Sequence, residues 1–230
     1  MTHLLPIRQP MHPSAFSETR IRGVRVGKAI LNIVTDFAEQ GWAIRENFLD
    51  EQHWRAMADE AGQLWEQGAF RKAGMGRLAE HRLQAEIRGD YSLWLDPQQT
   101  PAAFRFVAEE LEALRAALNA SLYLGLFEFE AHLAIYPPGA SYARHVDQLH
   151  GSAARRVSMA FYLNDGWRAT DGGELCLYPP SIPRRAVTRK MMVLPAGGTL
   201  AVFGSADMPH AVRPATRPRL SLSGWFRSRA

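Results

Sequence analysis

The second half of the chain is a series of short apolar runs separated by turn-forming residues. From residue 126 onward the runs are FEFEAHLAIY, RRVSMAFYLND, GGELCLYPP, KMMVLPAGG, TLAVFGS and RLSLSGWFR. Glycine, proline, asparagine and aspartate lie within or between them. Short strands joined by tight turns are typical of an antiparallel barrel or sandwich. This half of the chain therefore favours an all-β architecture.

The first half has helical patterns instead. GKAILNIVTDFAEQG predicts a helix that ends at Gly41, and Asp50 is placed to cap the start of a second helix. A third helix is predicted in DPQQTPAAFRFVAEELEALRAAL, whose apolar residues form one stripe. Helices followed by strands predict an α+β fold. We expect a flexible arm over residues 1–27 and a single domain over 28–230, with helical support over about 28–120 and the β-barrel over about 126–228.

Composition is that of an ordinary globular protein, with 230 residues of which 47% are hydrophobic. The only cysteine, Cys176, cannot form an internal disulfide, and it is expected to belong to the core. No apolar run is long enough to cross a bilayer, and the N-terminus lacks the apolar segment of a secretory signal. These features predict a cytoplasmic protein with no membrane partner. No pattern predicts the oligomeric state.

Charge is concentrated near the C-terminus, where residues 181–230 hold nine lysines or arginines and one acid, Asp207. Such a surface is often only solvated, but it could also face an anionic cosubstrate or an acidic partner. The sequence has no zinc finger, aromatic RNA-binding motif or basic helix, so nucleic acid is not indicated.

Metal-binding chemistry is suggested by SYARHVDQLH, residues 141–150. On a strand, His145 and Asp147 lie two residues apart and project from the same face. The third ligand could be His132, His150 or His210; His210 is favoured because its segment, SADMPHAVRPA, is a turn after an apolar strand. Two histidines and a carboxylate leave coordination positions open, as in non-haem Fe(II) oxygenases, although a catalytic zinc could use the same ligands.

Arg219 follows His210 by nine residues, in a run that alternates between two faces. One face carries Arg219, Ser221, Ser223 and Trp225, and the other Leu220, Leu222 and Gly224. An arginine on the inner face of a barrel is costly unless an anion pairs with it, and no acid is near in sequence. A dicarboxylate cosubstrate would match the permanently charged guanidinium fork.

These motifs, taken in order, resemble those of the Fe(II)/2-oxoglutarate-dependent oxygenases. The resemblance rests on YARHVD, FYLNDGW, GGELCLYP and PHAVRPATRPRLSLSGWF, and it extends upstream to IRGDYSLWLD. It covers roughly residues 85–227 and is strongest to the prolyl hydroxylases of the oxygen-sensing type and their bacterial relatives. The resemblance implies a double-stranded β-helix, or jelly-roll, with supporting helices. The loop after Asp147 is one residue longer than in those relatives and YPPGAS is one shorter, which concerns the substrate rim.

The resemblance also implies roles for particular residues. Fe(II) would be held by His145, Asp147 and His210. The distal carboxylate of 2-oxoglutarate would bind Arg219 and the hydroxyl of Tyr162. Tyr136 would line the pocket near the iron-bound end of the cosubstrate, and Ser223 and Trp225 match a small hydroxylic residue and an aromatic residue of the final strand. O₂ would be the second cosubstrate, with ascorbate as reductant.

The implied function is hydroxylation of a prolyl residue in a protein substrate, with release of succinate and CO₂. The loop near Gly74–Leu83 would fold over the substrate. One alternative is hydroxylation of a free amino acid, a small metabolite or another protein side chain. A more remote alternative is a non-catalytic binding module that uses the basic surface.

Overall fold

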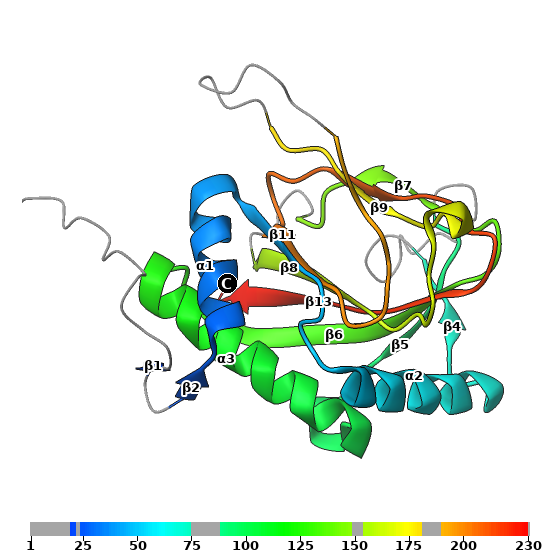
Figure 1. Ribbon diagram of the computed structural model, residues 1–230, viewed down its shortest axis with the longest axis horizontal. Coiled ribbons are helices and arrows are strands. Elements are labelled where there is room, and N and C mark those ends of the chain that lie inside the picture. Colours follow the sequence, from blue (N-terminus) through cyan, green and yellow to red (C-terminus); the bar gives the residue numbers. More distant parts are fainter. Residues whose placement is uncertain (1–18, 22–23, 75–87, 149–153, 181–189, 230) are drawn as a thin grey trace, which may run out of the picture.

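The computed structural model describes residues 19–21, 24–74, 88–148, 154–180 and 190–229. Within these ranges two antiparallel sheets face each other, and helices cover the outer side of the larger one (Figure 1). The helices are α1 (Lys28–Gln40), α2 (Glu51–Glu66) and α3 (Arg105–Leu122), with short 3₁₀ turns at Pro97–Gln99, Ala102–Phe104 and Ala169–Asp171. None of the described helices is long and apolar enough to cross a membrane.

The helix ends follow the local chemistry of the sequence. Gly41 ends α1 in the left-handed conformation, with φ of 80°, and its N–H donates to the carbonyl of Phe37. The Asp50 carboxylate caps α2 by accepting from the backbone N–H of His53 at 3.0 Å. Both predicted caps are therefore confirmed, and the apolar stripe predicted for α3 is buried (Phe104, Val107, Leu111, Leu114 and Leu118).

The larger sheet has the strand order β3-β11-β8-β13-β6-β5-β4. Its strands are β3 (Trp42–Arg45), β4 (Arg71–Lys72), β5 (Tyr91–Trp94), β6 (Leu126–Tyr136), β8 (Arg155–Tyr162), β11 (Leu200–Gly204) and β13 (Arg219–Ser228). The smaller sheet has the order β10-β9-β12-β7. Its strands are β7 (Tyr142–His145), β9 (Leu175–Leu177), β10 (Met191–Val193) and β12 (His210–Val212).

The larger sheet separates two hydrophobic cores. Alternate residues of its strands, such as Leu222 and Phe226 on β13, pack with the helices. The intervening residues face the smaller sheet, where Tyr162, Leu177 and Phe203 belong to the second core. This period of two places one side of every central strand inside the barrel. The predicted α+β fold with a two-sheet β core is confirmed.

The N-terminal half contributes strands as well as helices. The sequence predicts strands in WAIRENFL and around Ile87–Leu95, and these segments contain β3 and β5, which together with β4 extend the larger sheet. Residues 19–26, inside the expected irregular arm, contain the antiparallel pair β1 (Thr19–Ile21) and β2 (Val24–Val26). Short strands that depend on a distant partner leave little local signal, because pairing is decided by tertiary contacts. The expected substrate loop, Gly74–Leu83, lies outside the described residues except for Gly74.

Candidate active site

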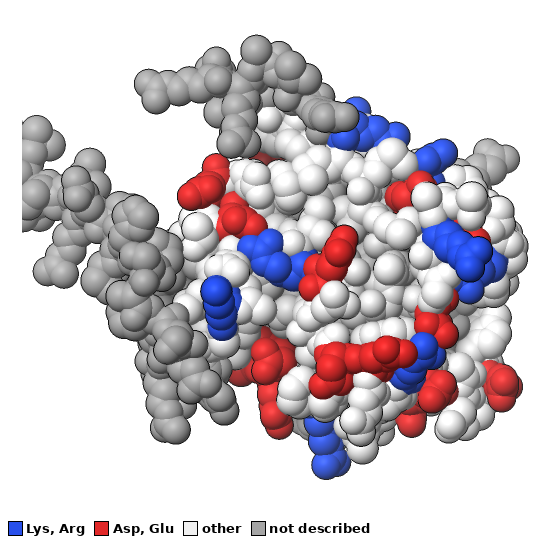
Figure 2. Space-filling model, viewed as in Figure 1, with Lys and Arg blue, Asp and Glu red and all other residues white. Residues whose placement is uncertain are grey.

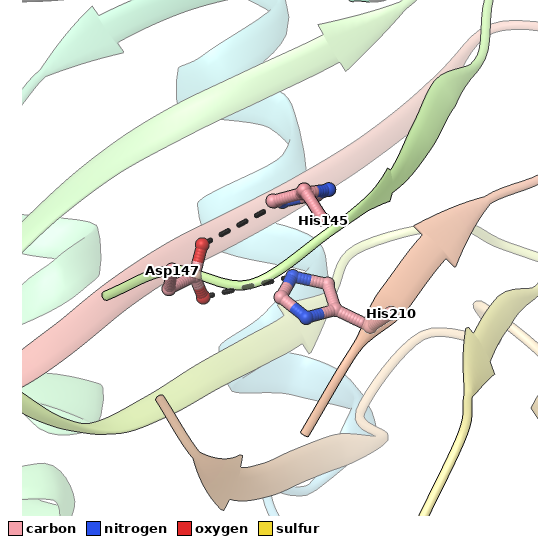
Figure 3. Close-up of side chains that lie close together, drawn as sticks. All are labelled: His145, Asp147 and His210. Carbon is pink, nitrogen blue, oxygen red and sulfur yellow. Dashed lines mark ion pairs between the residues drawn. The ribbon is translucent and has the colours of Figure 1, made fainter. Parts of the chain in front are cut away.

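His145, Asp147 and His210 come together at one end of the smaller sheet, with one ligand atom of each within 4.8 Å of the others. The Nε2 atoms of both histidines lie 3.6 Å from the Asp147 carboxylate, one from each oxygen (Figure 3). His145 and His210 are direct partners in the β7–β12 register. His210 is thus the first residue of β12, whereas the sequence predicted a turn. Pairing with β7 and β9 on both sides explains the strand.

Each histidine is oriented by the backbone carbonyl of the residue two positions before it. The Nδ1 of His145 is 2.8 Å from the carbonyl of Ala143, and the Nδ1 of His210 is 3.0 Å from that of Met208. A carbonyl only accepts, so each Nδ1 carries a proton, and the Nε2 of each ring is the atom that faces the Asp147 carboxylate. Burial also lowers the pKa of His210 below 6.5, against the opposing effect of Asp147. This is the state in which imidazole binds a metal.

The third ligand group is kept ionised despite its burial. Burial by itself raises the pKa of the Asp147 carboxyl, but His210, His145 and the Ser158 hydroxyl together lower it below its usual value. Ser158 donates to the carboxylate at 2.7 Å and also contacts the Ser205 hydroxyl at 2.9 Å. The carboxylate is therefore anchored on the larger sheet while its histidine neighbours come from the smaller one.

Arg219 lies at the other end of the barrel interior and is only 2% exposed. Its Nε donates to the carbonyl of Gly173 at 2.8 Å, and no carboxylate of the described residues pairs with the guanidinium. The guanidinium carbon is 4.9 Å from the ring of Tyr162 and 5.2 Å from that of Tyr136. A buried cation without an anion is costly, so this arrangement calls for an anionic ligand.

Tyr162 supplies a second unsatisfied group beside Arg219. Its side chain is fully buried, and its hydroxyl has no hydrogen-bond partner among the described residues. Burial raises the pKa of this hydroxyl above 10, with a smaller opposing effect from Arg219. The hydroxyl therefore stays protonated at neutral pH and can donate to an acceptor.

Gly173 is required where the backbone approaches Arg219. Its φ is +72°, and a Cβ at this position would lie 3.2 Å from Cδ of Arg219 and 2.9 Å from Cβ of Ala215. Only glycine combines this backbone conformation with so close an approach. A pair of adjacent glycines is typical of a turn with positive φ, and Gly172 and Gly173 have φ of 70° and 72°. The sequence alone did not connect Gly173 with the arginine.

A cavity of about 500 Å³ joins these groups, a volume that suits a small-molecule site. Its lining includes the group of His145, Asp147 and His210 together with Arg219, Tyr136, Ser223 and Trp225. Tyr162 is not part of the lining, but its ring lies 4.9 Å from the guanidinium carbon of Arg219, which is part of it. His132, one of the alternatives for the third ligand, lines the cavity but does not belong to the His-Asp-His group. His150, the other alternative ligand, falls outside the described residues.

The comparisons with known proteins agree with this geometry. Residues 131–227 match the family model described as the 2OG-Fe(II) oxygenase superfamily. A solved Pseudomonas putida prolyl-4-hydroxylase is 40% identical, with a TM-score of 0.76 over 87% of this chain and 100% of that chain. The chain belongs to the 2OG-Fe(II) oxygenase superfamily.

Two further relatives of this oxygenase are prolyl hydroxylases. One is the structure of a Trichoplax adhaerens prolyl hydroxylase in complex with a peptide fragment of the hypoxia-inducible factor oxygen degradation domain. It is 26% identical, with a TM-score of 0.77 over 87% of this chain and 90% of that chain. The other is a Caenorhabditis elegans hypoxia-inducible factor prolyl hydroxylase, 30% identical over 206 residues. That match covers 85% of this chain but only 28% of the relative.

The oxygenase's own residues fit the groups that the family uses. Two imidazoles and one carboxylate on one side of a cavity form the donor set of a non-haem Fe(II) site with open positions. A buried guanidinium and an unpaired hydroxyl at the other end match a carboxylate. The site is therefore compatible with Fe(II) and with 2-oxoglutarate, and the jelly-roll fold is that of its relatives.

Several contributing residues were not predicted. Ser158, which holds Asp147, and Gly173, which receives Arg219, act through partners far away in sequence. Ser158 had a usable signal, because it alternates with Ala160 and Tyr162 in RRVSMAFY and so faces the same side as the tyrosine. For Gly173 the sequence offered only its place in a glycine pair, which indicates a turn but not a contact with Arg219.

Proposed function

We propose that this oxygenase hydroxylates a prolyl residue in a protein substrate. Fe(II) would be held by His145, Asp147 and His210, and the distal carboxylate of 2-oxoglutarate by Arg219 and Tyr162. The observation that carries the proposal is the single cavity with a His-Asp-His group at one end and a buried, anion-free arginine at the other. The similarity to prolyl hydroxylases supports proline as the target.

When bound, the iron would supply oxygen activation that couples conversion of 2-oxoglutarate and O₂ to succinate and CO₂ with insertion of one oxygen atom into a substrate C–H bond. The residues of the chain fix positions and protonation. Arg219 would neutralise the distal carboxylate, and the Tyr162 hydroxyl would donate to it. Ser158 would keep the Asp147 carboxylate oriented toward the metal. We expect Tyr136 and Ser223 to line the space between the arginine and the metal.

The non-catalytic alternative is less well supported. A binding module would not need a buried arginine without an anion, which costs free energy when the cavity is empty. In Figure 2, acidic side chains gather over α2 and α3 while basic ones are scattered, so the face in view is not a uniformly basic surface. We therefore favour the enzyme.

The test uses purified protein with Fe(II), ascorbate as reductant and 2-oxoglutarate under ¹⁸O₂. We expect succinate formation and a mass increase on prolyl residues of proteins in a cell lysate. Absence of both succinate and iron retention would contradict the enzyme, whereas succinate with labelling of small molecules only would point to the metabolite alternative.

Two variants test the assigned roles. His145→Ala should lose iron binding. Arg219→Ala should raise the dissociation constant for 2-oxoglutarate at least tenfold and leave iron binding intact, because the arginine contacts only the far end of the cosubstrate. Arg213→Ala is the matched control, since that side chain is 51% exposed and pairs with Glu174 outside the cavity lining. Equal loss of iron and cosubstrate in Arg219→Ala would contradict the roles.

A further inference from the structure

His132 occupies an unusual place in the cavity wall. It lies on β6, directly opposite Trp94 of β5 and Ser223 of β13 in the sheet register. Its ring is 4.9 Å from that of Trp94 and 5.4 Å from that of Trp225, and the two tryptophan rings are 6.0 Å apart, so the three rings form one cluster. The imidazole is only 3% exposed, whereas Trp94 is 54% exposed. The three rings thus connect the interior of the cavity with its mouth.

The ring stack is held from the opposite side by charged residues. The guanidinium of Arg155 lies over the Trp225 ring at 3.6 Å. Glu130 accepts from Arg155 at 2.8 Å and from Arg227 at 3.2 Å, and it is the register partner of Trp225. A cation stacked on tryptophan and fixed by a carboxylate makes the wall rigid in advance of binding.

Two nitrogen atoms in this wall are unsatisfied. The Nδ1 of His132 and the Nε1 of Trp225 are buried and have no hydrogen-bond partner among the described residues. Leaving a buried polar atom unpaired costs about 1–3 kcal/mol, so such atoms are rare unless a ligand completes them. Burial lowers the pKa of His132 to about 4, with a further lowering by Arg88. The imidazole is therefore neutral at physiological pH and has one donor and one acceptor.

The position of His132 in the sheet indicates which ligand it serves. Asp147 accepts a hydrogen bond from Ser158 on β8, and the sheet order places β6 two strands from β8. At the usual strand spacing this is roughly 10 Å across the sheet, on the side toward β5. Arg219 lies instead along the strands, four residues before Ser223 on β13. The cavity therefore extends from the metal-binding triad in two directions. The proposed cosubstrate would occupy the direction that leads to Arg219, which leaves the direction toward His132 and Trp94 for the primary substrate.

We propose that His132 is a specificity-determining residue for the primary substrate, and that its neutral imidazole exchanges a hydrogen bond with the backbone of the polypeptide beside the hydroxylated residue. The proposal rests on the proposed function, because it assumes a polypeptide substrate. A peptide backbone offers both N–H and C=O groups and so can satisfy either tautomer of the ring. The exposed face of Trp94 would pack against the apolar part of the same segment.

The test compares His132→Phe, which keeps a stacked ring without nitrogen atoms, with His132→Asn, which keeps a polar atom near the position of Nδ1. His53→Phe is the matched control, since His53 stacks on Phe106 and does not line the cavity. Each protein is assayed for 2-oxoglutarate affinity, for succinate formation without peptide, and for kcat/KM on the peptides that the wild-type enzyme labels with ¹⁸O.

We expect His132→Phe to keep its 2-oxoglutarate affinity and peptide-independent turnover, while kcat/KM for the peptides falls about tenfold, as expected for one lost hydrogen bond. His132→Asn should recover part of that loss. In the Zn(II)-loaded wild type, the ¹⁵N resonance of His132 Nδ1 should shift when peptide is added.

Unchanged kcat/KM in His132→Phe would overturn the inference, as would a parallel loss of 2-oxoglutarate affinity or an unmoved Nδ1 resonance. If His132→Asn is folded but its kcat/KM for the peptides is no higher than that of His132→Phe, the proposed hydrogen bond is contradicted. Failure of the wild type to label any protein would instead contradict the proposed function, so the two failures are distinguishable.

Discussion

Replacing His132 with phenylalanine should flatten the acid dependence of the unfolding free energy of the metal-free protein. The pKa of the buried imidazole is about 4 in the folded protein, against 6.5 for an ordinary histidine. As the pH falls below 6.5, the unfolded chain therefore binds this proton while the folded protein does not. Proton uptake by the unfolded state lowers the free energy of unfolding, and the loss is complete only below about pH 4.

The size of the effect follows from the two pKa values. Between pH 7 and pH 5, His132 should remove about 2 kcal/mol from the free energy of unfolding, which is roughly a thirtyfold change in the equilibrium constant. The charged groups that act on the ring are Arg88, Asp90, Arg155 and Asp147. All four remain in the phenylalanine variant, so their own titration contributes to both proteins.

The assay is urea denaturation of wild type and His132→Phe at pH 7 and pH 5, with a chelator present to keep both proteins free of metal. The wild-type midpoint should shift between the two pH values by about 1 M more than that of the variant. A shift of equal size in both proteins would show that His132 takes up its proton while folded, and would refute the account of a buried neutral imidazole.

Three further predictions concern the site. Tyr162→Phe should leave the free protein at least as stable, because the buried hydroxyl has no hydrogen-bond partner among the described residues, yet should weaken 2-oxoglutarate binding about tenfold by calorimetry; destabilisation of the free protein would contradict this. Gly173→Ala should weaken 2-oxoglutarate through displacement of Arg219 while metal content stays normal, and loss of metal would argue against so local an effect. Ser158→Ala should lower metal affinity by about tenfold or more in a competition assay, because Asp147 loses its donor; unchanged affinity would show that the hydroxyl is dispensable.

Much of the site could be predicted from the sequence because strand alternation is a local property. A period of two put Arg219 in line with Ser223 and Trp225. It also drew attention to His145 and Asp147, but β7 ends at His145, and Asp147 lies in the bend that follows, where Ser158 holds its carboxylate. What local patterns could not supply were the partners of these residues.

The stack formed by His132 with Trp94 and Trp225 shows this limit. It joins three strands whose register is set by tertiary pairing, and a single histidine in EFEAHLAIY gave no sign of which ring would lie next to it. The places of β3 and β5 in the larger sheet could not be predicted for the same reason, and β4, which has only two residues, was missed.

The position of β13 in the larger sheet also determines whether a substitution on this strand affects folding or turnover. Residues with odd numbers from Arg219 to Trp225 face the cavity side, whereas Leu222 and Phe226 pack with the helices. A saturation scan of this strand should therefore give two interleaved classes. Changes at Leu222 and Phe226 would lower the amount of folded protein. Changes at the odd-numbered positions would alter turnover in protein that accumulates normally. Adjacent residues of one strand can therefore be changed by selection with almost independent effects, one on the chemistry of the enzyme and the next on its abundance.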